Sequence, residues 1–260
     1  AYVDSSNYIF MKTAALQEDT ILIDINKESM QPIVPKSFNN MNLKKGDILI
    51  SKDSNVGEVA ILDKDYPNVM LCAGIYKLPI TTNKYYFLAF AKNNIFKQQI
   101  DFLVPRGSTI RHGKTKFLEC KIPFPNKDAK NVIKYVEVLM KAIIDKEIQI
   151  RSKHKLILKK IEEELINNQL EKKYKYECPT ISSINRFKRL DTSLYSDEFE
   201  KNNFLVKNYK GGYINLVERG YKGIRGTSLE NNFIKTRINS DEYLDGFYEL
   251  IIPTNISEYG

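Results

Sequence analysis

The sequence has 260 residues, with 40 Lys and Arg against 32 Asp and Glu, and a net charge of +8. This length suits one large domain or two smaller ones, and a hydrophobic content of 42% excludes a wholly disordered chain. No apolar run approaches the roughly 18 residues that a membrane span needs, and no basic start precedes an apolar stretch, so we predict neither a membrane segment nor a signal peptide.

The positive charge is unevenly spread. Residues 1–125 carry a net charge of +4, residues 126–175 carry +5, and residues 176–260 carry −1. A positive field attracts polyanions but does not identify one. The cysteines are odd in number and far apart, which argues against a disulfide framework or a zinc site and favours a reducing, cytoplasmic location; they are Cys72, Cys120 and Cys178.

Residues 1–125 are predicted to form a domain of mixed β-structure with short helices. Enrichment in β-branched and apolar residues predicts strands at residues 20–25, 46–51, 59–62 and 70–78. The polar segment 52–57 ends in Gly, as a hairpin loop does. Residues 84–98 are predicted to be helical, residues 106–115 to form a basic loop bounded by Gly, and Pro123 and Pro125 to close the region.

Residues 126–176 are predicted to form one long amphipathic helix. The sequence has neither Gly nor Pro from residue 126 to residue 178, and apolar residues recur at intervals of seven, as in a coiled coil. These residues are Val136, Ile143, Ile150 and Ile157, with Leu139, Ile161 and Leu165 on or beside the stripe. At about 1.5 Å per residue, some 45 residues would extend roughly 65–70 Å. Such a stripe needs a partner helix, in this chain or in another.

Residues 177–260 read as a partial second module of the same kind. Pro179 breaks the helix, residues 199–209 predict a short helix or strand, residues 210–213 a turn and residues 213–218 a strand. Segments 7–15 and 247–256 share an aromatic residue, an apolar run and a Thr, which suggests two copies of one module. The apolar segment near residue 260 leads us to expect that this second module is incomplete.

Motifs for catalysis or cofactor binding are missing from the sequence. It contains no phosphate-binding GxxxxGK[ST], no GxGxxG after a strand, no HExxH and no GxSxG. The two histidines, His112 and His154, are too few and too distant for a histidine-based metal site. We therefore predict a binding protein with no catalytic residues, no metal and no cofactor, although an enzyme with an unrecognised site stays open.

Three basic-polar loops are the candidate nucleic-acid contacts. Lys, Arg, Asn, Ser and Thr side chains donate hydrogen bonds to phosphates and base edges, and Gly lets the backbone approach closely. The candidates in the first loop are Lys52, Ser54 and Asn55; in the second, Arg106, Ser108, Thr109, Arg111, His112 and Lys114; in the third, Arg225, Thr227 and Ser228. Each loop could equally be an ordinary solvated connection. Lys92, Asn93 and Asn94 are expected to cap a helix.

The order of these parts resembles the DNA-specificity subunit of Type I restriction–modification systems. A strand–loop–strand at residues 46–60 precedes the loop with Gly107, Ser108 and Thr109, then an "IPxP" strand at residues 122–125 and a long charged helix. Residues 189–195 resemble the entry to a second recognition domain. The resemblance covers most of the chain and depends more on the order of its parts than on any single motif.

The resemblance implies an α/β (α+β) recognition domain in a subunit without catalysis of its own. Such a subunit binds double-stranded DNA, with one half-site per recognition domain. Its helices pair antiparallel and dock an adenine methyltransferase subunit, which holds the S-adenosylmethionine site, and a restriction subunit completes the assembly. The expected domains are a recognition domain at 1–125, a spacer helix at 126–176 and a partial second recognition domain at 177–260.

The chain also departs from this pattern. The family has two complete recognition domains and two helices, whereas one nearly complete domain, one helix and the opening of a second domain are recognisable here. The chain would then be part of a larger subunit, or two chains would complement each other through self-association of the helix. Two alternatives stay open: part of a fused type II restriction–methyltransferase enzyme, and a protein-interaction scaffold that dimerises through the helix.

Overall fold

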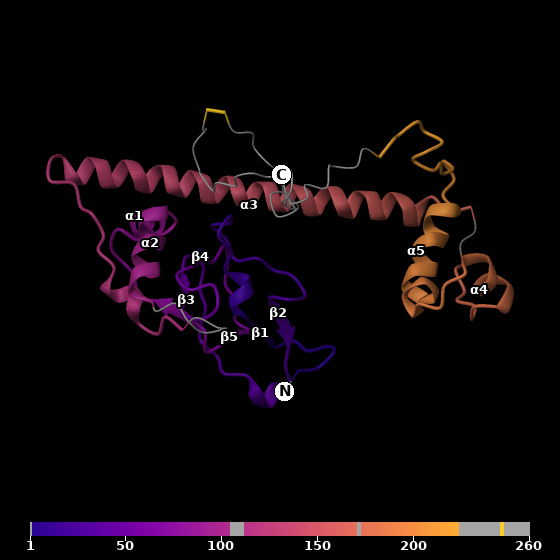
Figure 1. The fold of residues 1–260 in the computed structure, drawn as a ribbon, viewed down its shortest axis with the longest axis horizontal. Helices are drawn as coiled ribbons and strands as arrows, with labels where there is room; N and C mark the ends of the chain where they lie inside the picture. The colour runs from indigo at the N-terminus through magenta and orange to yellow at the C-terminus, as the bar shows by residue number, and fades with distance from the viewer. Residues whose placement is uncertain (1, 105–111, 171–172, 224–244, 247–260) are drawn as a thin grey trace. The chain divides into compact units, whose positions relative to one another are not determined.

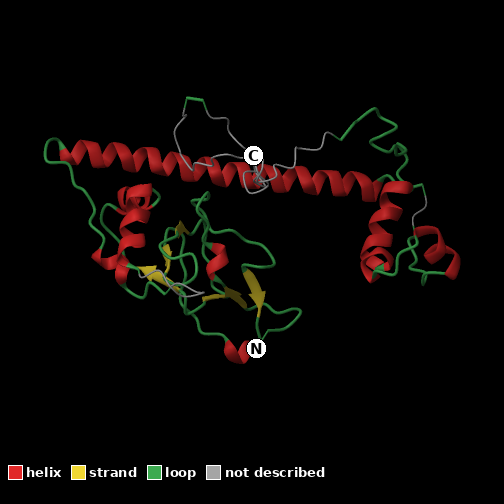
Figure 2. Ribbon diagram, in the orientation of Figure 1, coloured by secondary structure: helices red, strands yellow, loops and turns green. Residues whose placement is uncertain are grey.

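The computed structural model describes residues 2–104, 112–170, 173–223 and 245–246 (Figure 1). The chain divides into two compact units, Ala1–Ser152 and Lys153–Gly260. Figure 2 shows strands and short helices in the first part of the chain, followed by one long helix. The predicted α/β class, a mixed-sheet domain followed by a long helix, is confirmed.

Two small sheets form the framework of the first unit. In the first sheet, β1 (Ile9–Met11) lies between β2 (Met30–Pro32), to which it is antiparallel, and β5 (Val69–Leu71), to which it is parallel. The second sheet is antiparallel, with β3 (Ile48–Ser51) between β4 (Val59–Ile61) and β6 (Ile75–Leu78). The predicted hairpin is therefore confirmed, with the loop at residues 52–57 joining β3 to β4.

The apolar run at residues 70–78 is two strands and not one. β5 joins the first sheet and β6 joins the second, with a break at Cys72–Gly74. Cys72 donates its backbone N–H to Met11, and Gly74 lies so close to Thr13 that an added Cβ would come within 2.8 Å of its methyl carbon. The close packing of these residues against the N-terminal segment redirects the chain from one sheet to the other.

Both faces of the β3–β4 hairpin are buried, which explains its continuous apolar sequence. Side chains alternate between the two faces of a strand. Leu49 and Ala60 face one core cluster, with Met11, Leu16 and Leu71. Ile48, Ile50, Val59 and Ile61 face a second cluster that contains apolar residues of the helices. The hairpin is thus clamped between two cores, which fixes the position of its loop.

The expected helix at residues 84–98 is interrupted. It forms α1 (Lys84–Ala91) and α2 (Asn94–Leu103), separated by Lys92 and Asn93. Lys92 caps the C-terminal end of α1, as predicted, while the Asn93 side chain accepts a hydrogen bond from the Ile95 N–H at the start of α2. Three short 3-10 helices complete this unit: η1 (Thr13–Ala15), η2 (Pro35–Ser37) and η3 (Lys116–Glu119).

The prediction of a strand at residues 20–25 is wrong. This segment is irregular apart from a single parallel bridge between Leu22 and Ile61. Several of its backbone groups are paired with side chains of the long helix, while the Ile21 carbonyl and the Asp24 N–H pair with the backbone of Ile61 and Ala15. Glu147 accepts hydrogen bonds from the N–H groups of Ile21 (3.1 Å) and Leu22 (3.4 Å), and Arg151 donates to the Ile23 carbonyl (2.6 Å). The Glu147–Arg151 ion pair, at 2.6 Å, joins the two side chains.

The predicted "IPxP" strand at residues 122–125 is also wrong. These residues belong to no strand, and side chains of α1 and α2 hold the segment in place. Tyr86 donates its hydroxyl to the Pro123 carbonyl (2.7 Å) and stacks on Phe124, while Gln99 exchanges two hydrogen bonds with the backbone of Lys121. The direct connection into the long helix is as predicted.

The long helix, α3 (Ala129–Asn167), has 39 residues and is shorter than expected at both ends. At about 1.5 Å per residue it extends roughly 58 Å. After the helix, Gln169 forms a β-bridge with Tyr209, and Leu170 donates its N–H to the Asn208 carbonyl. The helix ends here because these residues pair with residues 208–209 instead of continuing the helical hydrogen bonds. The buried residues of α3 are Met140 and Ile144, not the predicted stripe: Ile143, Ile150 and Ile157 are 50–56% exposed.

The described part of the second unit holds α4 (Ile181–Phe187), η4 (Thr192–Tyr195) and α5 (Asp197–Lys207). Of the two alternatives for residues 199–209, the helix is correct. The turn near residues 210–213 is confirmed, but the strand expected at 213–218 is wrong, because residues 216–220 form a turn. Segment 247–256, half of the suggested internal repeat, lies outside the described residues.

Candidate nucleic-acid interface

The first predicted loop is a tight connection between two buried strands. Ser54 lies at its tip, exposed, with a positive φ of 64°, and Gly57 has a φ of 90° at its end. Ser51 donates its hydroxyl to the Asn55 carbonyl, and Gly57 returns an N–H to the Ser51 carbonyl at 2.9 Å. These bonds fix the loop's backbone at the edge of the domain.

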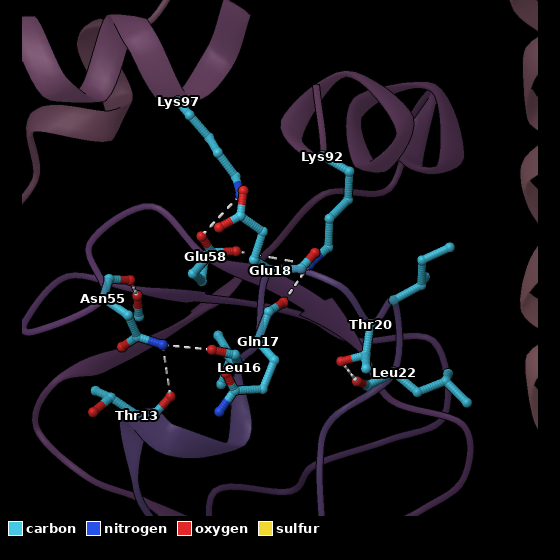
Figure 3. Close-up of polar contacts among 12 residues, drawn as sticks. Thr13, Leu16, Gln17, Glu18, Thr20, Leu22, Asn55, Glu58, Lys92 and Lys97 are labelled. Atoms are coloured by element: carbon cyan, nitrogen blue, oxygen red, sulfur yellow. Dashed lines mark hydrogen bonds and ion pairs between the residues drawn. The ribbon is translucent and has the colours of Figure 1, made fainter. Parts of the chain in front are cut away.

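Asn55 anchors this loop to the N-terminal segment (Figure 3). Its side-chain amide donates to the carbonyl oxygens of Thr13 (3.1 Å) and Leu16 (2.5 Å). Among the described residues, its Oδ1 atom is buried and has no hydrogen-bond partner. The amide nitrogen predicted to contact DNA therefore holds the loop in place.

The second loop reaches the first one at its C-terminal end. Asp53 and His112 form an antiparallel bridge, and Gly113 donates its N–H to the Lys52 carbonyl at 2.6 Å. Gly113 is buried against Val56, and an added Cβ would come within 2.4 Å of that side chain. Glycine is thus required at 113 for close contact. The structure brings together two loops that the sequence analysis selected separately.

Charged side chains gather where the loops meet. The Asp53 carboxylate lies 2.8 Å from His112 Nδ1 and 3.2 Å from Lys52 Nζ, which in turn lies 5.8 Å from the centre of the Tyr76 ring. Partial burial raises the pKa of Asp53, but hydrogen bonds and charge from His112 and Lys52 outweigh it and hold that pKa below its usual value. Asp53 is therefore ionised at neutral pH.

Of the other predicted contacts, Lys114 alone lies within the described residues. Lys114 is exposed, with a positive φ of 46°, next to the joined loops. The remaining predicted residues lie outside the described ranges; they are Arg106, Ser108, Thr109 and Arg111 in the second loop, and Arg225, Thr227 and Ser228 in the third.

A cluster of partly buried ion pairs supports the hairpin from beside its loop (Figure 3). Glu58 lies 3.2 Å from Lys97 Nζ and 3.8 Å from Lys92 Nζ, and Lys97 also pairs with Glu18. Lys92 donates to the carbonyls of Gln17 and Glu18. Burial lowers the pKa of Lys92 to about 8, although the neighbouring Glu58 raises it. The cluster ties the start of β4 to α1, α2 and the N-terminal segment.

Asp53 and this cluster were not among the residues predicted from the sequence to form the site. Asp53 is an acidic residue inside a basic loop, but its partner His112 is far away in the sequence. Only the folded chain brings His112 and the Lys52 side chain to the same carboxylate. Within the described ranges, no group of three or more His, Cys, Asp or Glu could hold a metal ion, and no helix is both long and apolar enough to cross a membrane. The site offers hydrogen-bond donors and positive charge.

A family profile described as the Type I restriction modification DNA specificity domain matches residues 4–172. This chain belongs to that family. The match spans the domain with the joined loops and all of α3. This is the family that the order of parts in the sequence resembled.

Among solved structures, the chain is similar to the HsdS subunit from Thermoanaerobacter tengcongensis. The two sequences are 12% identical, with a TM-score of 0.37, and the match covers 65% of this chain and 45% of that subunit. The chain therefore spans less than half the length of that protein. A search of curated proteins finds no match.

Proposed function

We propose that the first unit of this specificity-family chain binds duplex DNA sequence-specifically through the joined loops at residues 52–57 and 106–114. The observation that carries the proposal is their junction, in which Gly113 bonds to Lys52 and His112 bonds to Asp53. Two loops with donor side chains, held together on a rigid hairpin, can present several groups to one site on the duplex. Rigid support is what base reading requires.

The contacts proposed for this surface are the predicted residues, with Asn55 contributing as the loop's anchor. Cations position the protein on phosphates, while Lys, Arg and His side chains can also read base edges in the major groove. The proposed contacts are Lys52, Ser54, Arg106, Ser108, Thr109, Arg111, His112 and Lys114, and Asn55 holds the first loop in place. Arg225, Thr227 and Ser228 are proposed to serve a second module within residues 177–260.

We further propose that the chain has no catalysis of its own and directs an adenine methyltransferase subunit and a restriction subunit to DNA in the cytoplasm. The exposed stripe of α3 supports a helix partner, since Ile143, Ile150 and Ile157 are half exposed. The partner would be a second helix of the same subunit or of another copy. A helix of roughly 58 Å spans more than one duplex turn of about 34–36 Å, which suits a spacer between half-sites.

Selection of duplexes from a randomised library tests the DNA proposal. We expect the full chain to enrich one sequence, and Lys52→Ala and Lys114→Ala each to weaken its binding. Lys64→Ala is the matched control. Lys64 follows the end of β4 that is opposite to the loop, and its substitution removes the same positive charge. Failure to enrich any sequence, or equal losses in all three variants, would contradict the proposal.

The exposed stripe also favours the scaffold alternative, in which the helix pairs but the loops bind nothing. Retention of a duplex separates the two, while sedimentation of the wild-type chain and of an Ile143→Ser, Ile150→Ser double variant tests whether the stripe self-associates. Self-association through the stripe would be lost in the variant under either view. Retention of a selected duplex by the wild-type chain would exclude a pure scaffold, and copurification with a methyltransferase subunit would support the assembly.

A further inference from the structure

Asp53 places a negative charge where the proposed interface needs positive charge. Its side chain is only 20% exposed and lies between two proposed DNA contacts, His112 and Lys52. A carboxylate near phosphates is repelled, and DNA binding gains from each cation that neutralises a phosphate. On charge alone, Asp53 weakens DNA binding.

The geometry around Asp53 indicates what this carboxylate contributes. One oxygen, Oδ1, accepts from His112 Nδ1 at 2.8 Å, and the other, Oδ2, lies 3.2 Å from Lys52 Nζ. One carboxylate therefore holds the side chains of two separate loops at the point where their backbones also meet, through Gly113 and Lys52. A flexible Lys side chain gives up conformational freedom when it is held in this way.

The same bond fixes the proton on the His112 ring. An ionised carboxylate has no proton to donate, so the hydrogen of the 2.8 Å contact must be on Nδ1. In the neutral ring, Nε2 is then an acceptor and can bind the amino group of adenine or cytosine in the major groove. The His112 side chain is 60% exposed, which leaves most of the ring open to a ligand.

We propose that Asp53 is a positioning residue for DNA recognition, which orients Lys52 and His112 and keeps the neutral His112 ring in its Nδ1–H form. This inference rests on the proposed function of the two loops and adds a residue to it. Asp53 lowers the affinity for DNA in general while it raises the preference for the correct sequence.

The first experiment needs no DNA. Nitrogen NMR shifts of the full chain report which ring nitrogen of His112 carries hydrogen, at a pH where those shifts show a neutral ring. The wild-type chain is expected to show Nδ1–H. Asp53→Ala removes the acceptor and is expected to give the mixture typical of an unrestrained ring, whereas Asp53→Asn keeps an acceptor oxygen. An Nε2–H form in the wild-type chain would overturn the proposal, even if Asp53→Ala did not fold.

The second experiment separates positioning from charge. Dissociation constants are measured for the selected duplex and for a scrambled one, and their ratio is the preference. Asp53→Ala is expected to bind the scrambled duplex at least as tightly as wild type but to lose roughly tenfold in preference, the scale of one base contact. Asp53→Asn should fall between Asp53→Ala and wild type.

Asp65→Ala is the matched control for charge. Asp65 pairs with Lys44 at 3.0 Å and follows the end of β4 that is opposite to the loop. Asp65→Ala removes the same negative charge from the same domain. It should raise binding to both duplexes equally and leave the preference unchanged. An unchanged preference in Asp53→Ala would overturn this inference while the proposed function stands. A wild-type chain without preference would overturn both.

Discussion

The long helix α3 has two apolar faces that differ in burial. On one face, Met140 and Ile144 are buried in the same core as Leu88 and Phe96 of α1 and α2. On an adjacent face, the stripe that repeats every seven residues is exposed from Ile143 onward, whereas Val136 is half buried. The exposed side chains include Ile143, Ile150 and Ile157. The regular apolar repeat therefore lies on a solvent-exposed surface of α3. The contact with the rest of the first unit is formed by Met140 and Ile144, which are outside that repeat.

The comparison shows how one helix can serve two partners. The docked face combines apolar packing with the Glu147 and Arg151 clamp on residues 21–23, so its position on the recognition domain is specified by polar bonds as well as by burial. The open stripe is apolar at every seventh residue over several turns, which suits helix pairing, while Lys146 and Lys153 interrupt the seam beside it. A shift of α3 by one residue would turn the helix by about 100° and carry Ile144 out of the core, and the clamp resists that shift.

The largest expected effect comes from adjacent isoleucines on the two faces. Ile144→Ala should lower the free energy of unfolding by about 2–4 kcal/mol, because it leaves a cavity in the core. Ile143→Ala should lower it by less than about 1 kcal/mol, since that side chain is 50% exposed. Urea denaturation of the monomeric chain measures both. Equal losses would mean that the two faces do not differ as described.

The polar clamp should have the next largest effect. Glu147→Ala leaves the N–H groups of Ile21 and Leu22 without their acceptor and is expected to lower the free energy of unfolding by about 1–3 kcal/mol. Glu163→Ala removes an exposed ion pair with Lys159 on the same helix and should cost less than about 0.5 kcal/mol. Denaturation curves measure both variants. Equal free energies of unfolding for Glu147→Ala and Glu163→Ala would show that the clamp contributes little to the docking of α3.

A smaller effect concerns Lys92, which lies at the turn between the helices that receive α3. Its pKa is about 8 in the folded chain and near 10.5 when unfolded, so the unfolded chain binds more protons between these values. The free energy of unfolding should therefore rise with pH above about 8, by about 2 kcal/mol by pH 9.5. The free energy of unfolding is measured against pH for the wild-type chain and for Lys92→Met, and the rise should be absent from Lys92→Met. It should persist in Lys64→Met; its loss there would assign it to another group.

The sequence predicted the parts whose signal is local. The hairpin at 46–62, the long helix and the cap at Lys92 follow from apolar runs, missing Gly and Pro, and short-range polarity. Residues 20–25 have a strand's composition, but Glu147 and Arg151 take their backbone bonds from more than 120 positions away. The division of residues 70–78 between two sheets likewise depends on distant neighbours, and composition does not encode them.

The candidate site divides in the same way. Basic and polar residues in Gly-bounded loops can be selected from sequence, as Lys52 and His112 were. The bond between Gly113 and Lys52 and the place of Asp53 between two cations arise when loops about 60 residues apart meet. The anchoring of Asn55 on Thr13 and Leu16 likewise joins segments about 40 residues apart. Residue type suggested the ligand class, whereas the arrangement of donors required the fold.

The central claim is that the joined loops read duplex DNA, and salt dependence at two duplexes tests it most directly. Dissociation constants for the selected and scrambled duplexes are measured from about 50 to 200 mM salt. We predict that the logarithm of the binding constant falls linearly with the logarithm of the salt concentration, with a slope of about −0.9 per phosphate neutralised, and that the selected duplex stays at least about 100-fold preferred. A flat salt response, or equal binding of the two duplexes, would contradict the account.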